Sequence, residues 1–157
     1  MKHHIHLMIF LLASSIGCQT RIPVFNGNAA FTHLVAQCDF GPRNPGSVGH
    51  QKALDYFLNV LATLADTVST QSFTEVMPRS KQKVEMHNII AQFNPKAKKQ
   101  IMISAHWDTR PWGDRSLSIM RKDQPILGAN DGASGVAILL ELAKVLHDNP
   151  QKIGVNL

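Results

Sequence analysis

The spacing of apolar residues along the chain predicts three helices. In the first, Phe31, Leu34 and Val35 recur at helical spacing after Asn28, a residue type that caps helix N-termini. This helix is predicted to end near residues 40–41, because the prolines and glycines that follow cannot continue a helical backbone.

The other two helices have longer apolar faces. The second is predicted over about residues 50–64 and the third over about residues 133–147, where Asn149 and Pro150 stop it. Their apolar residues recur every three or four positions, as expected of one buried face. These positions are Leu54, Phe57, Leu58, Leu61 and Leu64 in the second helix, and Val136, Leu139, Leu140, Ala143 and Leu146 in the third.

Four stretches are predicted to be strands. Residues 68–76 and 84–93 have strand-like patterns, and residues 153–157 begin a last strand. Residues 101–105 form a short apolar run, which is typical of a buried central strand. The order of helices and strands indicates an α/β sandwich with a mixed sheet.

The chain has one long predicted loop, and its last helix and strand lack neighbours. Residues 107–127 are predicted to form a long loop, and loops of that length in compact domains tend to be functional or disordered. The last strand needs neighbours and the third helix needs a sheet to cover. We therefore expect the domain to continue past Leu157.

The first residues predict export. Residues 1–17 combine an early lysine with a short apolar stretch and small residues, which is the pattern of a signal peptide. Cys18 follows at the position that is acylated in bacterial lipoproteins, although Ser15 departs from the usual leucine, so a plain secretory signal is the alternative. We expect a periplasmic or outer-membrane lipoprotein of a Gram-negative bacterium. Residues 18–27 would form a tether and residues 28–157 the folded domain.

The composition is that of a folded globular protein. Apolar residues make up 44% and charged residues 17% of the 157 residues, and the formal net charge is +5. The positive charges are scattered and form no basic stripe interleaved with aromatic residues, which argues against a nucleic-acid partner. If Cys18 is lipidated, Cys38 is the only other cysteine, and a disulfide framework is excluded. We expect Cys38 to be a small buried residue.

The first candidate site is a His-x-Asp pattern directly after the apolar run. If the strand continues that far, His106 and Asp108 lie on one side of it, because strand side chains alternate. A carboxylate beside a histidine can accept the proton of one ring nitrogen and so leave the other free to bind a metal. On its own this pattern is weak, since an isolated His-x-Asp is more often an ordinary polar loop.

The second candidate is Asp131, at the predicted start of the third helix. Glycines and alanines surround it, so the backbone can turn sharply and a metal can approach. The positive end of the helix favours an ionised carboxylate, which is a competent zinc or calcium ligand. The alternative is that Asp131 and Ser134 only cap the helix, which does not explain the crowd of small residues.

Together the two stretches identify a family. The segments HWDTRPW at 106–112 and PILGANDGASGVAILLELAKVL at 125–146 resemble the M28 zinc peptidases and the related animal-type glutaminyl cyclases, which also occur in bacteria. The segment FGPRNPGS at 40–47 is similar to the family's stretch between its first two helices, and the resemblance covers nearly all of residues 28–157. The Arg-Pro-Trp of residues 110–112 favours the bacterial cyclase branch. The resemblance implies a three-layer, zinc exopeptidase-like sandwich.

The resemblance also implies roles for individual residues. Asp131 matches a zinc ligand that bridges two zinc ions in the peptidases, and its bond to Gly132 is cis in relatives. His106 matches a zinc ligand of the two-metal peptidases, whereas in the single-zinc cyclases this histidine does not hold the metal. Asp108 matches the residue that orients the histidine. Glu141 is expected to be structural or at the surface.

Three functions remain open at this stage. The first is zinc-dependent conversion of N-terminal glutamine in peptides or proteins to pyroglutamate, the second is a two-zinc aminopeptidase, and the third is a non-catalytic envelope lipoprotein or pseudoenzyme. By the resemblance, the other zinc ligands and a general acid/base glutamate belong to segments beyond Leu157. No catalytic residue is therefore assigned within the chain, and residues 1–157 alone are expected to have little or no activity. Oligomeric state is left open.

Overall fold

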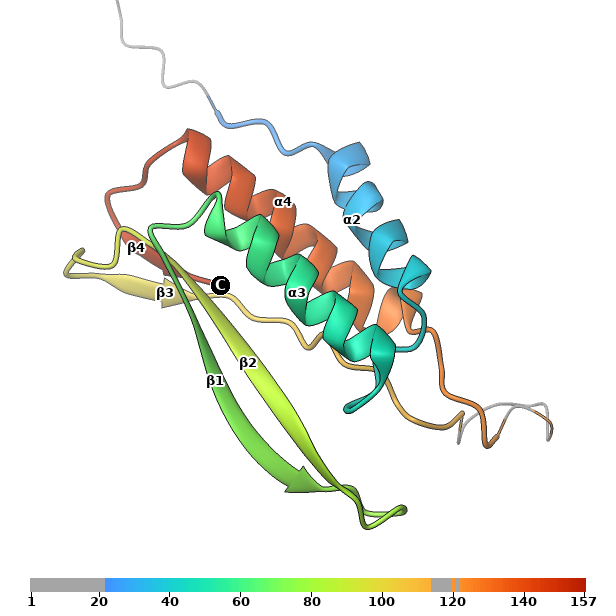
Figure 1. The fold of residues 1–157 in the computed structure, drawn as a ribbon. Coiled ribbons are helices and arrows are strands. Elements are labelled where there is room, and N and C mark those ends of the chain that lie inside the picture. Colours follow the sequence, from blue (N-terminus) through green and yellow to red (C-terminus); the bar gives the residue numbers. More distant parts are fainter. Residues whose placement is uncertain (1–21, 114–119, 121) are drawn as a thin grey trace, which may run out of the picture.

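A computed structural model describes residues 22–113, 120 and 122–157, and shows a four-stranded sheet with helices over one of its faces (Figure 1). The predicted α/β fold with a mixed sheet is confirmed. Cys18 and the rest of the expected signal peptide lie outside the described residues. Among the described helices, none is long and apolar enough to cross a membrane.

Helix α2 spans Gly27–Asp39 and packs against α4 rather than against the sheet. The sequence predicted Asn28 as the cap of this helix, and that prediction was wrong. The cap is Asn26, whose side chain accepts hydrogen bonds from the backbone N–H groups of Asn28 and Ala29. Asn28 already belongs to the first turn and supplies one of the donors that a cap must satisfy. Cys38 is free and only partly buried, so the expectation of a buried residue was wrong.

The other two helices match their predicted positions closely. Helix α3 spans Val48–Ala62, and the Ser47 hydroxyl caps it by accepting from the backbone N–H of His50 at 3.1 Å. Helix α4 spans Gly135–Asp148. Within α4, Glu141 is 6% exposed and its carboxylate accepts a hydrogen bond from the backbone N–H of Asn26 at 3.1 Å. Glu141 is thus a structural residue that ties the start of α2 to α4.

The sheet has the order β1-β2-β4-β3. The strands are β1 at Thr67–Val76, β2 at Lys83–Phe93, β3 at Gln100–Met102 and β4 at Gly154–Asn156. Strands β1 and β2 form a long antiparallel hairpin, β4 pairs antiparallel with β2, and β3 pairs parallel with β4. Because β4 comes last in the chain and lies between β2 and β3, α4 is the connection that returns the chain to the sheet.

The prediction of a buried central strand at residues 101–105 was wrong for the described chain. Strand β3 ends at Met102 and lies at the edge of the sheet, where Ile101 and Met102 are 45% and 69% exposed. The apolar run correctly indicated a strand, but a sequence run does not reveal which strands pair on either side of it.

The hydrophobic core lies between the sheet and helices α3 and α4. Helix α3 faces the β1–β2 hairpin, whereas α4 lies between α2 and α3 (Figure 1). This packing holds the N-terminal end of α4 close to the segment that follows β3. The core residues are Ala53, Phe57, Leu61, Ala91, Phe93, Val136, Leu140, Ala143, Leu146 and Val155.

The packing of α4 predicts unequal costs for two truncations on the same helix. Leu140 is 2% exposed and Ile138 is 53% exposed. We expect Leu140→Ala to lower the free energy of unfolding by about 2–5 kcal/mol, since it leaves a cavity in the core. Ile138→Ala, the matched control, should change it by no more than about 0.5–1 kcal/mol. Urea unfolding measures both, and equal losses would contradict the placement of the core.

Candidate metal centre

Two segments far apart in the chain meet at the candidate site. His106 lies four residues after β3, and Asp131 lies in the short irregular helix η2, at Ala129–Ser134, immediately before α4. The Nε2 atom of His106 is 2.8 Å from Oδ1 of Asp131. Both side chains are more than half exposed, at 57% and 65%, so an ion or substrate can reach them from solvent.

The small residues around Asp131 are explained by this close approach. A Cβ atom on Gly132 would lie 2.3 Å from the backbone oxygen of His106 and 2.7 Å from Cε1 of its ring. Gly128 has a φ of +63°, and a Cβ there would lie 2.4 Å from the backbone oxygen of Asp131. The peptide bond between Asp131 and Gly132 is cis, as the family resemblance implied.

The simple helix-cap interpretation does not describe Asp131 and Ser134. Asp131 has an extended backbone conformation inside η2 and is bonded to His106. Ser134 accepts no capping hydrogen bond, and its hydroxyl donates to the backbone oxygen of Asn130 at 2.6 Å. The Asp131 carboxylate therefore faces the histidine rather than the free N–H groups of α4.

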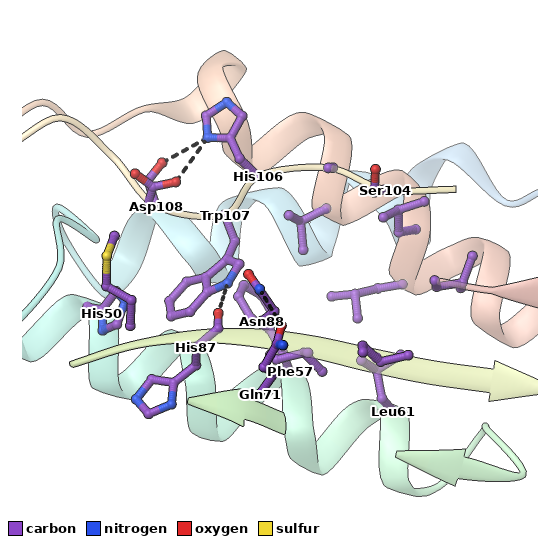
Figure 2. Close-up of a pocket in the computed structure, with 18 of the residues that line it drawn as sticks. His50, Phe57, Leu61, Gln71, His87, Asn88, Ser104, His106, Trp107 and Asp108 are labelled. Carbon is purple, nitrogen blue, oxygen red and sulfur yellow. Dashed lines mark hydrogen bonds and ion pairs between the residues drawn. The ribbon is translucent and has the colours of Figure 1, made fainter. Parts of the chain in front are cut away.

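Asp108 lies on the other side of the His106 ring. The Nδ1 atom of His106 is 3.2 Å from the backbone oxygen of Asp108 and 3.4 Å from its carboxylate (Figure 2). The hydrogen bond to Asp131 requires a proton on Nε2, whereas in the tautomer with its proton on Nδ1 the ring can donate to the Asp108 backbone oxygen and leave Nε2 free to bind a metal. Asp108 is thus placed to orient the ring, with its backbone carbonyl closer than the carboxylate named from the sequence.

The donor atoms suit a zinc ion in kind but not in number. Imidazole nitrogen and carboxylate oxygen are both ordinary zinc ligands, and those of His106 and Asp131 converge. A tightly bound zinc ion needs three or four protein donors, and the part of the chain that the structure describes contains no group of three or more His, Cys, Asp or Glu side chains able to hold one. Among the described residues, His106 and Asp131 therefore offer two converging donors of the kinds that zinc takes, fewer than a tight site needs.

A cavity of about 440 Å³ opens beside the site, between β2 and the segment that follows β3. Figure 2 shows His106 and Trp107 pointing to opposite sides of that segment, His106 toward Asp108 and Trp107 toward β2. The Nε1–H group of Trp107 donates to the backbone oxygen of His87 at 3.1 Å. The indole also stacks on the ring of His50, with the two ring centres 4.2 Å apart. The cavity is thus walled by aromatic and apolar side chains of α3 and α4, with amide groups on β2.

The long loop is joined to the β1–β2 hairpin. The guanidinium of Arg79, just after β1, lies 5.5 Å from the centre of the Trp112 ring and 2.7 Å from the carboxylate of Asp123. The backbone oxygen of Arg110 accepts from Ile126 at 3.2 Å. Residues 114–119 and 121 lie outside the described chain, whereas the Arg-Pro-Trp sequence at 110–112 is described in full.

The sequence analysis did not single out Arg43, His50 or Trp107, all of which support the site. The signals were present but ambiguous. Arg43 is a lone charge in a stretch of glycines and prolines, and Trp107 stands between the two residues of the His-x-Asp pattern. His50 lies at the start of a predicted helix, where an exposed polar residue is the ordinary expectation, yet it is 5% exposed.

Comparisons with known proteins agree with this geometry. The chain is 34% identical over 107 residues to the glutaminyl-peptide cyclotransferase of Drosophila melanogaster, a match that covers 68% of this chain and 27% of the relative. It is 35% identical, with a TM-score of 0.82, to the glutaminyl cyclase of Bacteroides thetaiotaomicron solved with N-acetylhistamine. It is 33% identical, with a TM-score of 0.83, to a zinc-dependent exopeptidase from Parabacteroides distasonis. Each structural match covers 87% of this chain and 46% of the other.

These matches define the class of protein as an α/β domain of the zinc exopeptidase-like kind that glutaminyl cyclases share. Residues 88–157 match peptidase family M28, and the chain is similar in sequence and fold to glutaminyl cyclases. The recognition made from the sequence is confirmed. The chain spans about a quarter of the Drosophila relative and just under half of the two solved chains.

The buried His50 predicts a pH dependence of stability. Burial lowers the pKa of His50 below its ordinary value of 6.5, His87 lowers it further, and Asp108 opposes the shift. Between the lowered pKa and 6.5 the unfolded chain binds a proton that the folded chain does not, so stability falls as the pH drops below about 6.5. His50→Gln should reduce this fall, measured by urea unfolding from about pH 7 to pH 5. Burial also lowers the pKa of His33, so His33→Gln should reduce the fall too.

The free energy of unfolding should be measured for His50→Gln, His33→Gln and the double variant across the same pH range. If it falls as steeply in all three as in the wild type, these two histidines are not neutral buried groups.

The contact between Gly132 and His106 predicts a strong effect of one added methyl group. We expect Gly132→Ala to lower the free energy of unfolding by about 1–3 kcal/mol, because the alanine Cβ must displace His106 or the η2 backbone. Gly27→Ala is the matched control, since no atom lies within 4 Å of a Cβ at that position. Its free energy of unfolding should stay within about 0.5 kcal/mol of the wild type. A Gly132→Ala variant as stable as the control would contradict the close approach.

Proposed function

We propose that this chain is part of a zinc-dependent glutaminyl-peptide cyclotransferase, which converts the N-terminal glutamine of peptides or proteins to pyroglutamate. The observation that carries the proposal is the convergence of His106 and Asp131 at 2.8 Å, on a fold shared with solved glutaminyl cyclases. In this proposal Asp131 is a zinc ligand, His106 lies at the metal as a ligand or a neighbour, and Asp108 orients the His106 ring.

The reaction needs little beyond correct placement of one residue of the substrate. The α-amine of the N-terminal glutamine attacks the carbonyl carbon of its own side chain, the amide C–N bond breaks, and ammonia leaves with the proton that the amine gives up. Nucleophile and electrophile belong to the same residue, so orientation supplies much of the rate. Zinc, when bound, supplies Lewis-acid polarisation of that carbonyl. The exposed face of His106 and Asp131 leaves room for the substrate N-terminus.

We further propose that the remaining zinc ligands and the general acid/base group come from residues beyond Leu157. Leu157 and Ala91 exchange backbone hydrogen bonds of 2.8 and 2.9 Å at one end of the cavity. Asn156 pairs with Met102 in the parallel register, and His106 lies four residues after Met102. A strand that continued β4 in this register would therefore reach the level of His106 four residues after Asn156. Such a strand would fill the cavity and end beside the metal. The chain alone would then have little or no activity.

A two-zinc aminopeptidase is the second candidate. The supporting observation is that the Nε2 atom of His106 faces the Asp131 carboxylate, as expected if both bind a metal, together with the match to a zinc-dependent exopeptidase. In that case Asp131 would bridge two ions. The Arg-Pro-Trp sequence at 110–112 favours the cyclase. For either activity we propose an exported protein, anchored through a lipid on Cys18, that acts on peptide N-termini in the cell envelope.

The proposal predicts turnover of glutaminyl peptides by the full-length protein. Pyroglutamate and ammonia should form from a peptide with N-terminal glutamine, activity should vanish on zinc chelation and return with zinc, and leucyl anilide should not be hydrolysed. Asp131→Asn should lower kcat/KM by at least about 100-fold, because several kcal/mol of transition-state stabilisation depend on the bound metal.

Asp148→Asn is the matched control, since among the described residues this carboxylate pairs with Lys144 alone, on the surface of α4. It should leave turnover unchanged. Hydrolysis of the anilide without any pyroglutamate formation would sink the cyclase assignment and favour the aminopeptidase. Full activity of Asp131→Asn would exclude a metal role for Asp131 in either enzyme.

A further inference from the structure

Arg43 has the largest fully buried side chain in the described part of the chain, with no exposed surface. A buried guanidinium is costly unless its N–H groups are bonded. Arg43 donates from Nη1 to the backbone oxygen of Gln37 at 2.9 Å, from Nε to that of Trp107 at 3.1 Å and from Nη2 to that of Gly128 at 2.9 Å. One side chain thus joins the end of α2, the segment after β3 and the residue that precedes η2.

Two of these bonds reach the segments that form the metal centre. Trp107 directly follows His106, and Gly128 lies three residues before Asp131. The Nε and Nη2 groups form one edge of the guanidinium, where two N–H bonds run parallel at a fixed spacing. The planar edge therefore holds one carbonyl from each segment.

The backbone of Arg43 strengthens the link to the first segment. Its N–H donates to the hydroxyl of Thr109 at 2.9 Å, and its carbonyl accepts from the Thr109 N–H at 3.3 Å. Thr109 is 2% exposed. Burial lowers the pKa of Arg43, and Asp108 opposes this, but within the described residues no carboxylate accepts a hydrogen bond from the guanidinium. Arg43 is therefore used for the geometry of its donors rather than for an ion pair.

We propose that Arg43 is a positioning residue of the metal centre. By holding the carbonyls of Trp107 and Gly128 at a fixed separation, it sets the two segments at the distance at which His106 and Asp131 meet. The inference deepens the proposed function and rests on it, because it assumes that zinc binds at this pair.

The test compares Arg43→Lys and Arg43→Met in the full-length protein. The zinc dissociation constant, measured by competition with a chelator and with zinc alone as the probe, should rise about 10–100-fold in both variants, as for other residues that orient metal ligands. Lysine keeps the charge but lacks the planar edge, so it should not rescue zinc binding. With saturating zinc, kcat should fall while KM stays within about threefold, since the substrate surface is untouched.

Lys144→Met is the matched control for loss of a cation, because Lys144 is exposed on α4 and its one ion pair in the described part of the chain is with Asp148. Zinc affinity should stay unchanged in this variant. All measurements are made below the onset of thermal unfolding of each variant. If both Arg43 variants fail to fold, Thr109→Val replaces them, because it removes the hydroxyl that accepts from the Arg43 backbone. It should weaken zinc binding in the same direction, and an unchanged affinity would overturn the proposal.

The outcomes separate this inference from the proposed function. A folded Arg43→Lys or Arg43→Met variant with lower thermal stability but wild-type zinc affinity and kcat would show a purely structural role and overturn the inference alone. Full rescue by lysine would also overturn it, because charge would then suffice. A wild-type protein that binds no zinc would overturn the metal centre and the inference together. Zinc binding without glutaminyl turnover would overturn only the cyclase assignment and leave the zinc comparison valid.

Discussion

The packing of helix α4 against the sheet is the constraint on which the site depends. Leu140 and Ala143 anchor the helix in the core, and this anchoring leaves little freedom for the residues just before its first turn. At that end, a Cβ on Gly135 would lie 3.0 Å from the Cβ of Ala105, and one on Gly132 would collide with His106. The helix and the segment after β3 are therefore in direct contact, and the two candidate ligands meet as a consequence of core packing.

The sequence predicted the positions of most elements, because each has a strong local signal. Helical spacing located α3 and α4 to within a few residues, and the candidate ligands were found because they stand at the ends of such elements. The cap of α2 was misplaced by two residues, since Asn26 and Asn28 both suit that position and only the backbone distinguishes them. The edge position of β3 could not be predicted, because β4, its one partner among the described strands, comes more than 50 residues later in the chain.

The supporting residues were missed for a related physical reason. Arg43 bonds to carbonyls 64 and 85 residues away, and no periodicity or spacing in a sequence reveals such contacts. His50 is buried beneath rings from other segments, since Trp107 stacks on it and His87 lies nearby. Each of these residues is unremarkable within its own helix or loop. Their importance comes from the tertiary fold, whereas the ligands themselves are recognisable because metal chemistry restricts their residue types.

The cyclase and aminopeptidase readings share this geometry and differ in what surrounds it. Both activities need an N-terminal residue held beside a polarised carbonyl, and in either proposal His106 and Asp131 would lie at the metal. The choice between them therefore depends on the number of further ligands and on the walls of the substrate site. Trp112 contacts Arg79, which lies just after β1. This contact joins the β1–β2 hairpin to the Arg-Pro-Trp sequence at 110–112, on which the preference for the cyclase rests.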